Sequence, residues 1–488
     1  MPDNIKYKVF SGLFWKFTER IGIQGIQFVI SIVLARLLAP SDFGIIGLIT
    51  VFIAIAGIFV SSGFGQSLIQ KKEVDDIDYS SVFYMSLVIS IFMYIGLYFL
   101  APLISVFYEE SILIPIIRVL SLTLILGAIN SIQNAVLTKN MMFKKTFIVN
   151  LGGIITSGIV GIAIAYLGYG VWALVISQLA SQVVTTIIMW FTVKWRPKLL
   201  FSLERLRSLF NFGSKLLVSG LLDTIYNNLY SLIIGKLYSR ELLGYYNRGQ
   251  SMPNLFASTI NGTIGGVMFP ALVLHQNDIN RLKTLVKRMI VTSTFFVFPM
   301  MVGLAAVAKP LVLILLTDKW LPCVPYLQIS CITFAFYPIH TSNLQAVNAI
   351  GRSDVFLKLE IVKKIIGITA IFVTAPFGVM AMVIGLAVIS VICTAINALP
   401  NKKLLNYSYK EQMMDILPSI LLSTVMGGIL LVVFLFRFNS VITLVIQALV
   451  GIVFYFTAAY ILKFECFRYL IKMIRKGKGT LKQSHQIA

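Results

Sequence analysis

The chain has 488 residues, of which 58% are hydrophobic and 12% are charged. Ordinary soluble domains average roughly 45–50% and 25% in these two classes, so the composition predicts a membrane protein and excludes a soluble one. The net charge of +22 would suggest a nucleic-acid partner in a soluble protein. In a membrane protein it is typical of Lys and Arg gathered in cytoplasmic loops, and no nucleic-acid partner is expected.

Apolar segments of about 20 residues, the length that crosses a bilayer as a helix, recur along the chain. They predict an all-α polytopic membrane fold, because only helices and closed barrels satisfy their backbone hydrogen bonds in lipid and barrel strands are about half as long. No sizeable domain outside the membrane is predicted. The fourteen predicted spans cover residues 11–38, 43–68, 80–107, 113–137, 147–167, 170–194, 211–238, 245–271, 289–316, 323–347, 357–375, 378–399, 414–436 and 440–462.

The chain contains an internal repeat. IVLARLLAPSDFG at residues 32–44 aligns with LIIGKLYSRELLG at residues 232–244, which places Gly44 over Gly244. With small changes of offset, Ala101-Pro102-Leu103 aligns with Lys309-Pro310-Leu311. A repeat of this length predicts two related six-helix lobes, residues 1–200 and 201–400. Two additional transmembrane helices and a basic cytoplasmic tail follow over residues 401–488.

Lys and Arg are distributed unevenly between the two sides of the predicted membrane. With the N-terminus in the cytoplasm, 30 of the 41 lie on the cytoplasmic side, 4 on the opposite side and 7 inside the spans. This excess predicts that both termini are cytoplasmic and supports an even number of spans. The first apolar segment has charges inside it, so we expect a retained span and not a cleaved signal peptide.

Three predicted spans carry polar side chains at helical spacing. A charged side chain at a helix centre costs about 2.5–3.5 kcal/mol on insertion scales, so we interpret these stripes as facing one shared water-filled cavity. The stripes are Lys16, Arg20, Gln24, Gln27 and Ser31 in the first span, Lys215, Ser219, Asp223, Tyr226, Asn227 and Tyr230 in the seventh, and Arg248, Ser251, Asn254, Ser258 and Asn261 in the eighth.

An alternative interpretation of the cations is that they reach the lipid headgroups or join helices by hydrogen bonds. For Lys16, Lys236 and Lys309, which lie near span ends, the two interpretations are equally favoured. Arg20 and Arg248 each belong to a polar stripe, and this favours a role in the cavity.

The remaining candidate groups are few. Asp223 is a candidate for coupling transport to protons or sodium ions, and an ion pair with Lys215 is the alternative. His340 is more typical of a hydrogen-bonded core histidine than of a proton relay. The 4 cysteines lack metal-ligand spacing, so we expect no disulfide, metal site or bound cofactor. No nucleotide-binding loop or catalytic triad is evident, so the sequence does not indicate an enzyme.

LARLLAPSDFGIIGL at residues 34–48 and LLGYYNRGQ at residues 242–250 resemble the Wzx-type polysaccharide repeat-unit flippases. These are polysaccharide transporters of the multidrug, oligosaccharidyl-lipid and polysaccharide exporter superfamily, and the likeness is greatest to the colanic-acid branch. It covers nearly the whole chain. It implies a V-shaped pair of lobes in the bacterial inner membrane, with alternating access. Its cationic cavity would hold an undecaprenyl-diphosphate-linked oligosaccharide for exopolysaccharide, lipopolysaccharide O-antigen or capsule assembly.

The resemblance also implies partners, a polysaccharide polymerase and a chain-length regulator. A multidrug antiporter or another lipid-linked precursor exporter of the same superfamily is the alternative, but an antiporter would favour acidic cavity residues. A membrane polymerase or ligase would be expected to carry a sizeable external loop. Together the stripes and the resemblance predict that the diphosphate is bound by Lys16, Arg20, Arg248 and Lys215, and the sugar by Gln24, Gln27, Asn227 and Asn254.

Overall fold

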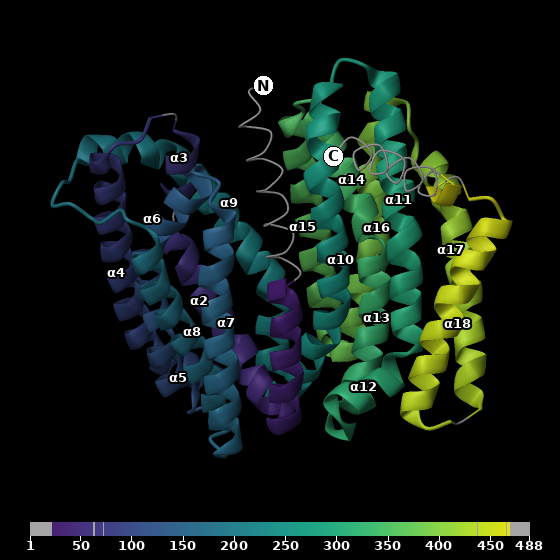
Figure 1. The fold of residues 1–488 in the computed structure, drawn as a ribbon, viewed down its shortest axis with the longest axis horizontal. Helices are drawn as coiled ribbons and strands as arrows, with labels where there is room; N and C mark the ends of the chain where they lie inside the picture. The colour runs from purple at the N-terminus through teal and green to yellow at the C-terminus, as the bar shows by residue number, and fades with distance from the viewer. Residues whose placement is uncertain (1–21, 62–63, 72, 437, 465, 469–488) are drawn as a thin grey trace, which may run out of the picture. The chain divides into compact units, whose positions relative to one another are not determined.

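The computed structural model describes residues 22–61, 64–71, 73–436, 438–464 and 466–468 (Figure 1). Over these residues the chain is built of helices and turns, with no strand. Nine of the described helices are long and apolar enough to cross a membrane, and a shorter apolar helix covers Gly22–Leu37. The all-α prediction is confirmed, and the chain is a multi-pass membrane protein.

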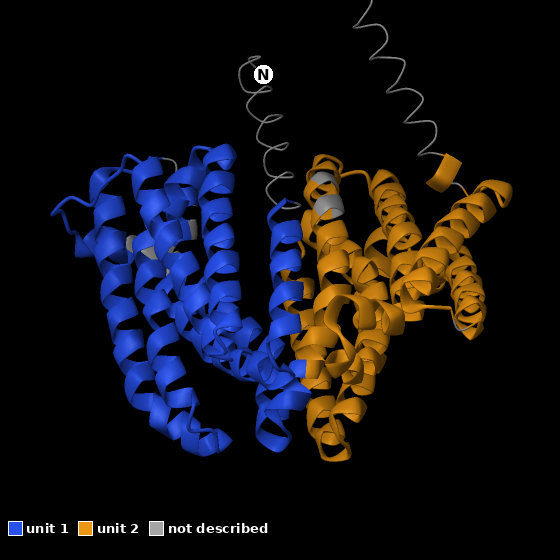
Figure 2. Cartoon of the chain, turned by 60° about the horizontal axis from the view of Figure 1, so that its bottom comes forward, with its two compact units in different colours: residues 1–244 blue, residues 245–488 orange. Residues whose placement is uncertain are grey.

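Packing divides the chain into two compact units, Met1–Gly244 and Tyr245–Ala488 (Figure 2). Besides Gly22–Leu37, the first unit contains α2 (Pro40–Ser61), α3 (Phe64–Gln70), α4 (Asp76–Tyr108), α5 (Leu113–Leu120), α6 (Leu122–Lys139), α7 (Phe143–Tyr166), α8 (Trp172–Thr192) and α9 (Leu203–Leu237). The second contains most of α10 (Arg240–Leu274), then α11 (Ile279–Ala306), α12 (Ala308–Leu316), the 3-10 helix η1 (Asp318–Cys323), α13 (Val324–Ala335), α14 (Tyr337–Ala349), α15 (Ser353–Thr374), η2 (Ala375–Phe377), α16 (Val379–Leu405), α17 (Tyr409–Leu435) and α18 (Ser440–Ile461).

Among the predicted spans that the structure describes without a gap, three are each formed by two consecutive helices: α5 with α6, α11 with α12, and α13 with α14. Proline explains two of these breaks, because its ring lacks an N–H and clashes with the carbonyl four residues earlier. Pro310 opposes the carbonyl of Ala306, where α11 ends. Pro338 opposes that of Phe334, one residue before the end of α13.

The third predicted span, 80–107, begins four residues earlier in the structure because its N-terminus is capped. Asp75 Oδ1 accepts a hydrogen bond of 2.9 Å from the backbone N–H of Asp78, and Asp78 Oδ2 accepts one of 3.3 Å from that of Asp75. This reciprocal arrangement satisfies N–H groups that a helix start otherwise leaves without partners. Asp78 is also buried beside Lys71, whose ammonium lies 2.5 Å from its carboxylate.

The two copies of the repeated sequence meet within the first unit, at the start of α2 and of α10. A Cβ atom on Gly44 would lie 1.7 Å from the carbonyl oxygen of Arg240, and one on Gly244 would lie 2.0 Å from that of Pro40. Glycine at both positions therefore allows the two helix starts to approach backbone to backbone. The matched glycines of the sequence repeat form one reciprocal contact.

Helix α9 packs in the first unit, against α2 and α4. Tyr108 donates a hydrogen bond of 3.4 Å to the carbonyl of Leu232. Lys236 lies 3.2 Å from Glu109 in an ion pair at the end of the helix. The packing boundary at residue 244 thus differs from the repeat boundary predicted at residue 200. The division into repeat-related lobes stays a prediction, because packing does not test a common origin.

Candidate substrate-binding residues

The polar stripe of the first span is only partly within the described residues. Lys16 and Arg20 lie outside them. Gln24 is half-buried and Gln27 is exposed, both on the helix Gly22–Leu37. The predicted stripe covers an arc of only about 80° at 100° per residue. Of this stripe, the amide of Gln27 lies at the surface of the first unit.

The stripe of the seventh predicted span lies on α9. Asp223 and Asn227, four residues apart, are both exposed on this helix, as expected for neighbours on one face. Tyr230 is buried. The side chain of Lys215 lies outside the described part of the structure, so its predicted ion pair with Asp223 is not tested.

The stripe of the eighth predicted span has exposed members on α10 between two buried ones at its margins. Ser251 and Asn254 are exposed, whereas Arg248 and Asn261 are each 8% exposed. The reason is the spacing, since each step of three residues falls 60° short of a full turn. The five predicted positions therefore spread over about 140°, with Arg248 at one margin.

Arg248 lies in the packing of the second unit, under η1. Its guanidinium carbon is 5.9 Å from the ring centroid of the fully buried Trp320, in a cation–π arrangement. The next residue, Gly249, has no room for a side chain, because a Cβ atom there would lie 2.8 Å from Cβ of Tyr326. This close approach of α10 to α13 holds Arg248 beside the ring of Trp320.

Three further cations of the predicted spans have different surroundings. The Arg118 guanidinium carbon lies 4.0 Å from the ring centroid of Tyr98. Lys236 donates a 2.6 Å hydrogen bond to the carbonyl of Phe107, which anchors it at the end of α9. Lys309 is exposed on α12, with its ammonium 5.8 Å from the ring centroid of Phe434. The position of a cation within its predicted span did not distinguish these three environments.

The structure also contains a buried amide cluster in the second unit that the sequence analysis missed. Asn343 of α14 and Gln412 of α17 exchange two hydrogen bonds, of 2.9 and 3.0 Å. Asn401 of α16 donates a third, of 2.6 Å, to Asn343 Oδ1. All three residues are fully buried. Asn343 lies inside the predicted span 323–347, but Asn401 and Gln412 lie just outside the spans 378–399 and 414–436, and the contact among the three depends on tertiary packing.

His340 lies on α14, one turn before Asn343. Asn397 Nδ2 donates to its ring Nδ1 over 3.1 Å, and its ring Nε2 lies 3.1 Å from Thr394 Oγ1. Both ring nitrogens are therefore occupied, as expected of a core histidine. On neighbouring α15, Lys363 forms a 2.5 Å ion pair with Glu360 about halfway along the helix; the positive-inside count places Lys363 on the cytoplasmic side.

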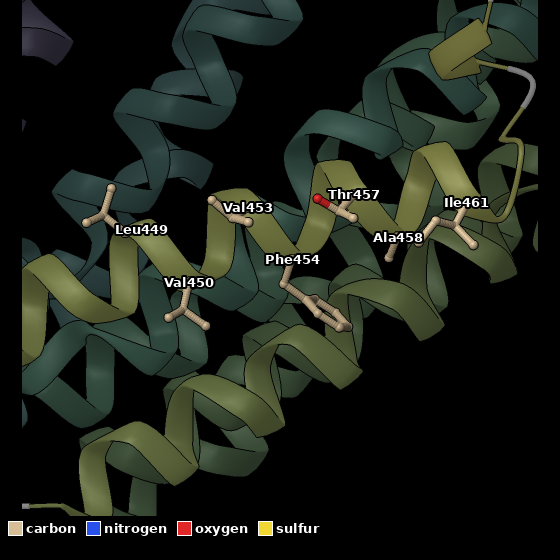
Figure 3. Close-up of a pocket in the computed structure, with 7 residues that line it drawn as sticks. All are labelled: Leu449, Val450, Val453, Phe454, Thr457, Ala458 and Ile461. Carbon is tan, nitrogen blue, oxygen red and sulfur yellow. The ribbon is translucent and has the colours of Figure 1, made fainter.

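An apolar groove follows the exposed side of α18 and has a volume of about 550 Å³ (Figure 3). Thr457 supplies the only hydroxyl among its lining residues. Such a surface is typical of a helix that faces lipid hydrocarbon. Within the described part of the chain, no group of three or more His, Cys, Asp or Glu could hold a metal ion.

Comparison with known proteins gave one family and several relatives. The profile of a family described as "Polysaccharide biosynthesis protein" matches residues 33–325. The lipopolysaccharide biosynthesis protein WzxC of Escherichia coli is 22% identical over 438 residues, covering 88% of this chain and 89% of that protein. The teichuronic acid biosynthesis protein TuaB of Bacillus subtilis is 24% identical, covering 72% and 74%. The succinoglycan biosynthesis transport protein ExoT of Rhizobium meliloti is 22% identical, covering 72% and 71%.

Two solved structures have the same fold. The lipid II flippase MurJ in an inward closed conformation superposes with a TM-score of 0.72 at 17% identity, covering 95% of this chain and 100% of that one. An inward-facing multidrug resistance transporter of the MATE family superposes with a TM-score of 0.62 at 13% identity, covering 80% and 98%. At these identities the likeness establishes the fold alone.

Proposed function

Because the chain belongs to the polysaccharide biosynthesis protein family, we propose that it is a flippase for undecaprenyl-diphosphate-linked oligosaccharide repeat units. The profile match over residues 33–325 carries the proposal. The relatives named above serve lipopolysaccharide, teichuronic acid and succinoglycan biosynthesis, the last as a transport protein, and this favours transport over catalysis. The product would enter exopolysaccharide, O-antigen or capsule assembly.

A diphosphate cannot enter hydrocarbon unless its water is replaced by other hydrogen-bond donors. We assign this role to Lys16, Arg20, Lys215 and Arg248, since charge-assisted hydrogen bonds to phosphate are about twice as strong as neutral ones. The polyprenyl tail can remain in lipid. The sugar hydroxyls would meet the amides of Gln24, Gln27, Asn227 and Asn254, of which the last three are exposed on their helices.

In this proposal, rocking between two repeat-related lobes exposes the head group to alternate sides of the membrane. Asp223 couples the cycle to protons or sodium ions, and its exposed position on α9 supports contact with solvent. Both termini lie in the cytoplasm and the membrane is the bacterial inner membrane. The polymerase and chain-length regulator that extend the repeat units act on the product after its transfer.

Mass spectrometry of the lipid fraction of cells with this gene deleted tests the function. We expect accumulation of an undecaprenyl-diphosphate oligosaccharide, facing the cytoplasm, and its disappearance when the gene is restored. An unchanged lipid fraction together with altered drug sensitivity would refute the flippase and favour an antiporter. The mass of the accumulated lipid would also identify the sugar.

Replacement of Arg248 tests the binding site. We expect Arg248→Gln to lower export about 10-fold to 100-fold, the effect of losing one charge-assisted hydrogen bond of about 1.5–3 kcal/mol. Arg352→Gln, which removes an exposed cation that pairs with Asp354, serves as the control. Membrane insertion is measured in parallel. Normal export by both Arg248→Gln and Arg20→Gln would refute this site while leaving the flippase function standing.

A further inference from the structure

An open groove of about 500 Å³ lies in the second unit, between α12 and the turn that joins α17 to α18. Its lining combines a charged side chain, hydroxyls and exposed apolar side chains, unlike the apolar groove on α18. Phe434 is 38% exposed and Phe438 is 48% exposed. The lining side chains important here are Lys309, Leu313, Phe434, Phe438, Ser440 and Thr443. A cationic and apolar lining is complementary to an amphiphile with an anionic head.

Lys309 is the charged member of the described lining. Its ammonium lies 5.8 Å from the ring centroid of Phe434, and no acidic side chain of the described residues forms an ion pair with it. Lys236, also near a span end, has Glu109 at 3.2 Å. A lysine near the end of a predicted span, with an aromatic neighbour and no acidic partner among the described residues, favours a bound anion.

The internal repeat shows that this lysine is specific to the second unit. Ala101, which aligns with Lys309, is fully buried inside the continuous helix α4. In the second unit the helix is interrupted at Val307, and the aligned residue is exposed beside α17 and α18. The cation therefore occurs where the two additional helices complete a groove.

We propose that this groove binds an anionic phospholipid, with the phosphate on Lys309 and an acyl chain against Leu313, Phe434 and Phe438. Among the described lining residues, the one ammonium matches the single negative charge of a phosphodiester. The Ser440 hydroxyl can donate to a phosphate oxygen. Thr443 Oγ1 donates to the carbonyl of Phe438 over 3.1 Å, which shapes the turn. With the cytoplasmic termini proposed above, the lipid belongs to the outer leaflet.

Native mass spectrometry of the purified full-length protein tests the site. The protein is mixed with equal amounts of phosphatidylglycerol and phosphatidylcholine, and the ratio of bound lipids is measured. We expect a preference for phosphatidylglycerol that falls about fivefold in Lys309→Gln, which corresponds to about 1 kcal/mol for one lysine near an anionic lipid. Lys309→Arg should retain the preference. Lys319→Gln, which removes a cation on η1 outside the groove lining, should leave it unchanged.

The wild-type protein gives a second measure that requires no substitution. We expect the preference to weaken with added salt, because screening lowers the attraction between exposed charges. Equal binding of both lipids by the wild type, or an undiminished preference in Lys309→Gln, would overturn the proposal. Displacement of phosphatidylglycerol by undecaprenyl phosphate at lower concentration than by phosphatidylglycerol itself would overturn the phospholipid as the occupant. None of these outcomes depends on the transport activity proposed above.

Discussion

Replacing Asn343 with leucine should destabilise the second unit about twice as much as replacing Gln412 with leucine. Without Gln412, both polar atoms of the Asn343 side chain keep a partner. Its Nδ2 still donates to the carbonyl of Ile339 over 2.9 Å, and its Oδ1 still accepts from Asn401 over 2.6 Å. The two hydrogen bonds to Asn343 are lost, together with the longer one of 3.5 Å from Gln412 Nε2 to the carbonyl of Tyr407, and at about 0.6 kcal/mol each in membranes this gives roughly 1–2 kcal/mol.

Without Asn343, four hydrogen bonds are lost, three to the other amides and one to the carbonyl of Ile339, and the buried amide of Gln412 loses both of its asparagine contacts. Its Nε2 keeps only the carbonyl of Tyr407 at 3.5 Å. A buried polar atom without a partner costs about 1–3 kcal/mol, so we expect roughly 2–4 kcal/mol in total. The double variant should cost about as much as Asn343→Leu alone, because the two side chains share the same bonds.

Equilibrium unfolding in mixed micelles of increasing SDS content, followed by tryptophan fluorescence, measures these free energies. Asn348→Leu is the control, since Asn348 is exposed on the same helix α14 and should change stability by less than about 0.5 kcal/mol. Equal losses of stability in the two single variants, or additive losses in the double variant, would contradict this explanation from the hydrogen-bond partners of Asn343 and Gln412.

Two other substitutions test the repeat contact and a surface ion pair. Gly44→Ala should lower stability by about 1–3 kcal/mol, because its Cβ would overlap the carbonyl of Arg240. Gly57→Ala is the control and should be tolerated, since the nearest neighbour of its Cβ lies at 3.9 Å. Equal unfolding midpoints for the two variants would contradict this prediction. The Arg352 side chain lowers the pKa of Asp354 to about 2, so the stabilisation by this pair is present above the unfolded pKa of about 3.9 and is lost as the pH falls toward 2. The difference in thermal midpoint between wild type and Asp354→Asn should vanish over that range, and a difference that persists at pH 2 would contradict it.

The all-helical fold and the order of the apolar segments could be predicted because the thickness of the bilayer fixes the length of such a segment. Interruptions inside a span were less predictable. Pro310 and Pro338 end helices at their i−4 carbonyls, whereas Pro102 lies inside the unbroken α4. Whether a proline bends or ends a membrane helix depends on which neighbours satisfy the released carbonyl, and the local sequence does not contain this information.

Sequence spacing predicted which candidate site residues share one face of a helix only where the stripe covers a narrow arc of that helix. Asp223 and Asn227 share the exposed face of α9 because their spacing of four residues turns the helix by only 40° beyond one turn. Steps of three residues separated Arg248 from Asn254, which sequence spacing alone had grouped together. The ion pair of Lys363 with Glu360 was missed because charge counting assigns a lysine to a side of the membrane without regard to an acid one turn away.

The amide cluster indicates that the last two transmembrane helices contribute to the stability of the second unit and are not an addition to a twelve-helix protein that is equally stable without them. Ending the chain after Asn406 would remove Gln412 and its two hydrogen bonds to Asn343. Both polar atoms of Asn343 would keep partners on α14 and α16, so the loss of these bonds would cost roughly 1–2 kcal/mol. The buried contact between α14 and α17 therefore makes the last two helices part of the packing of the second unit.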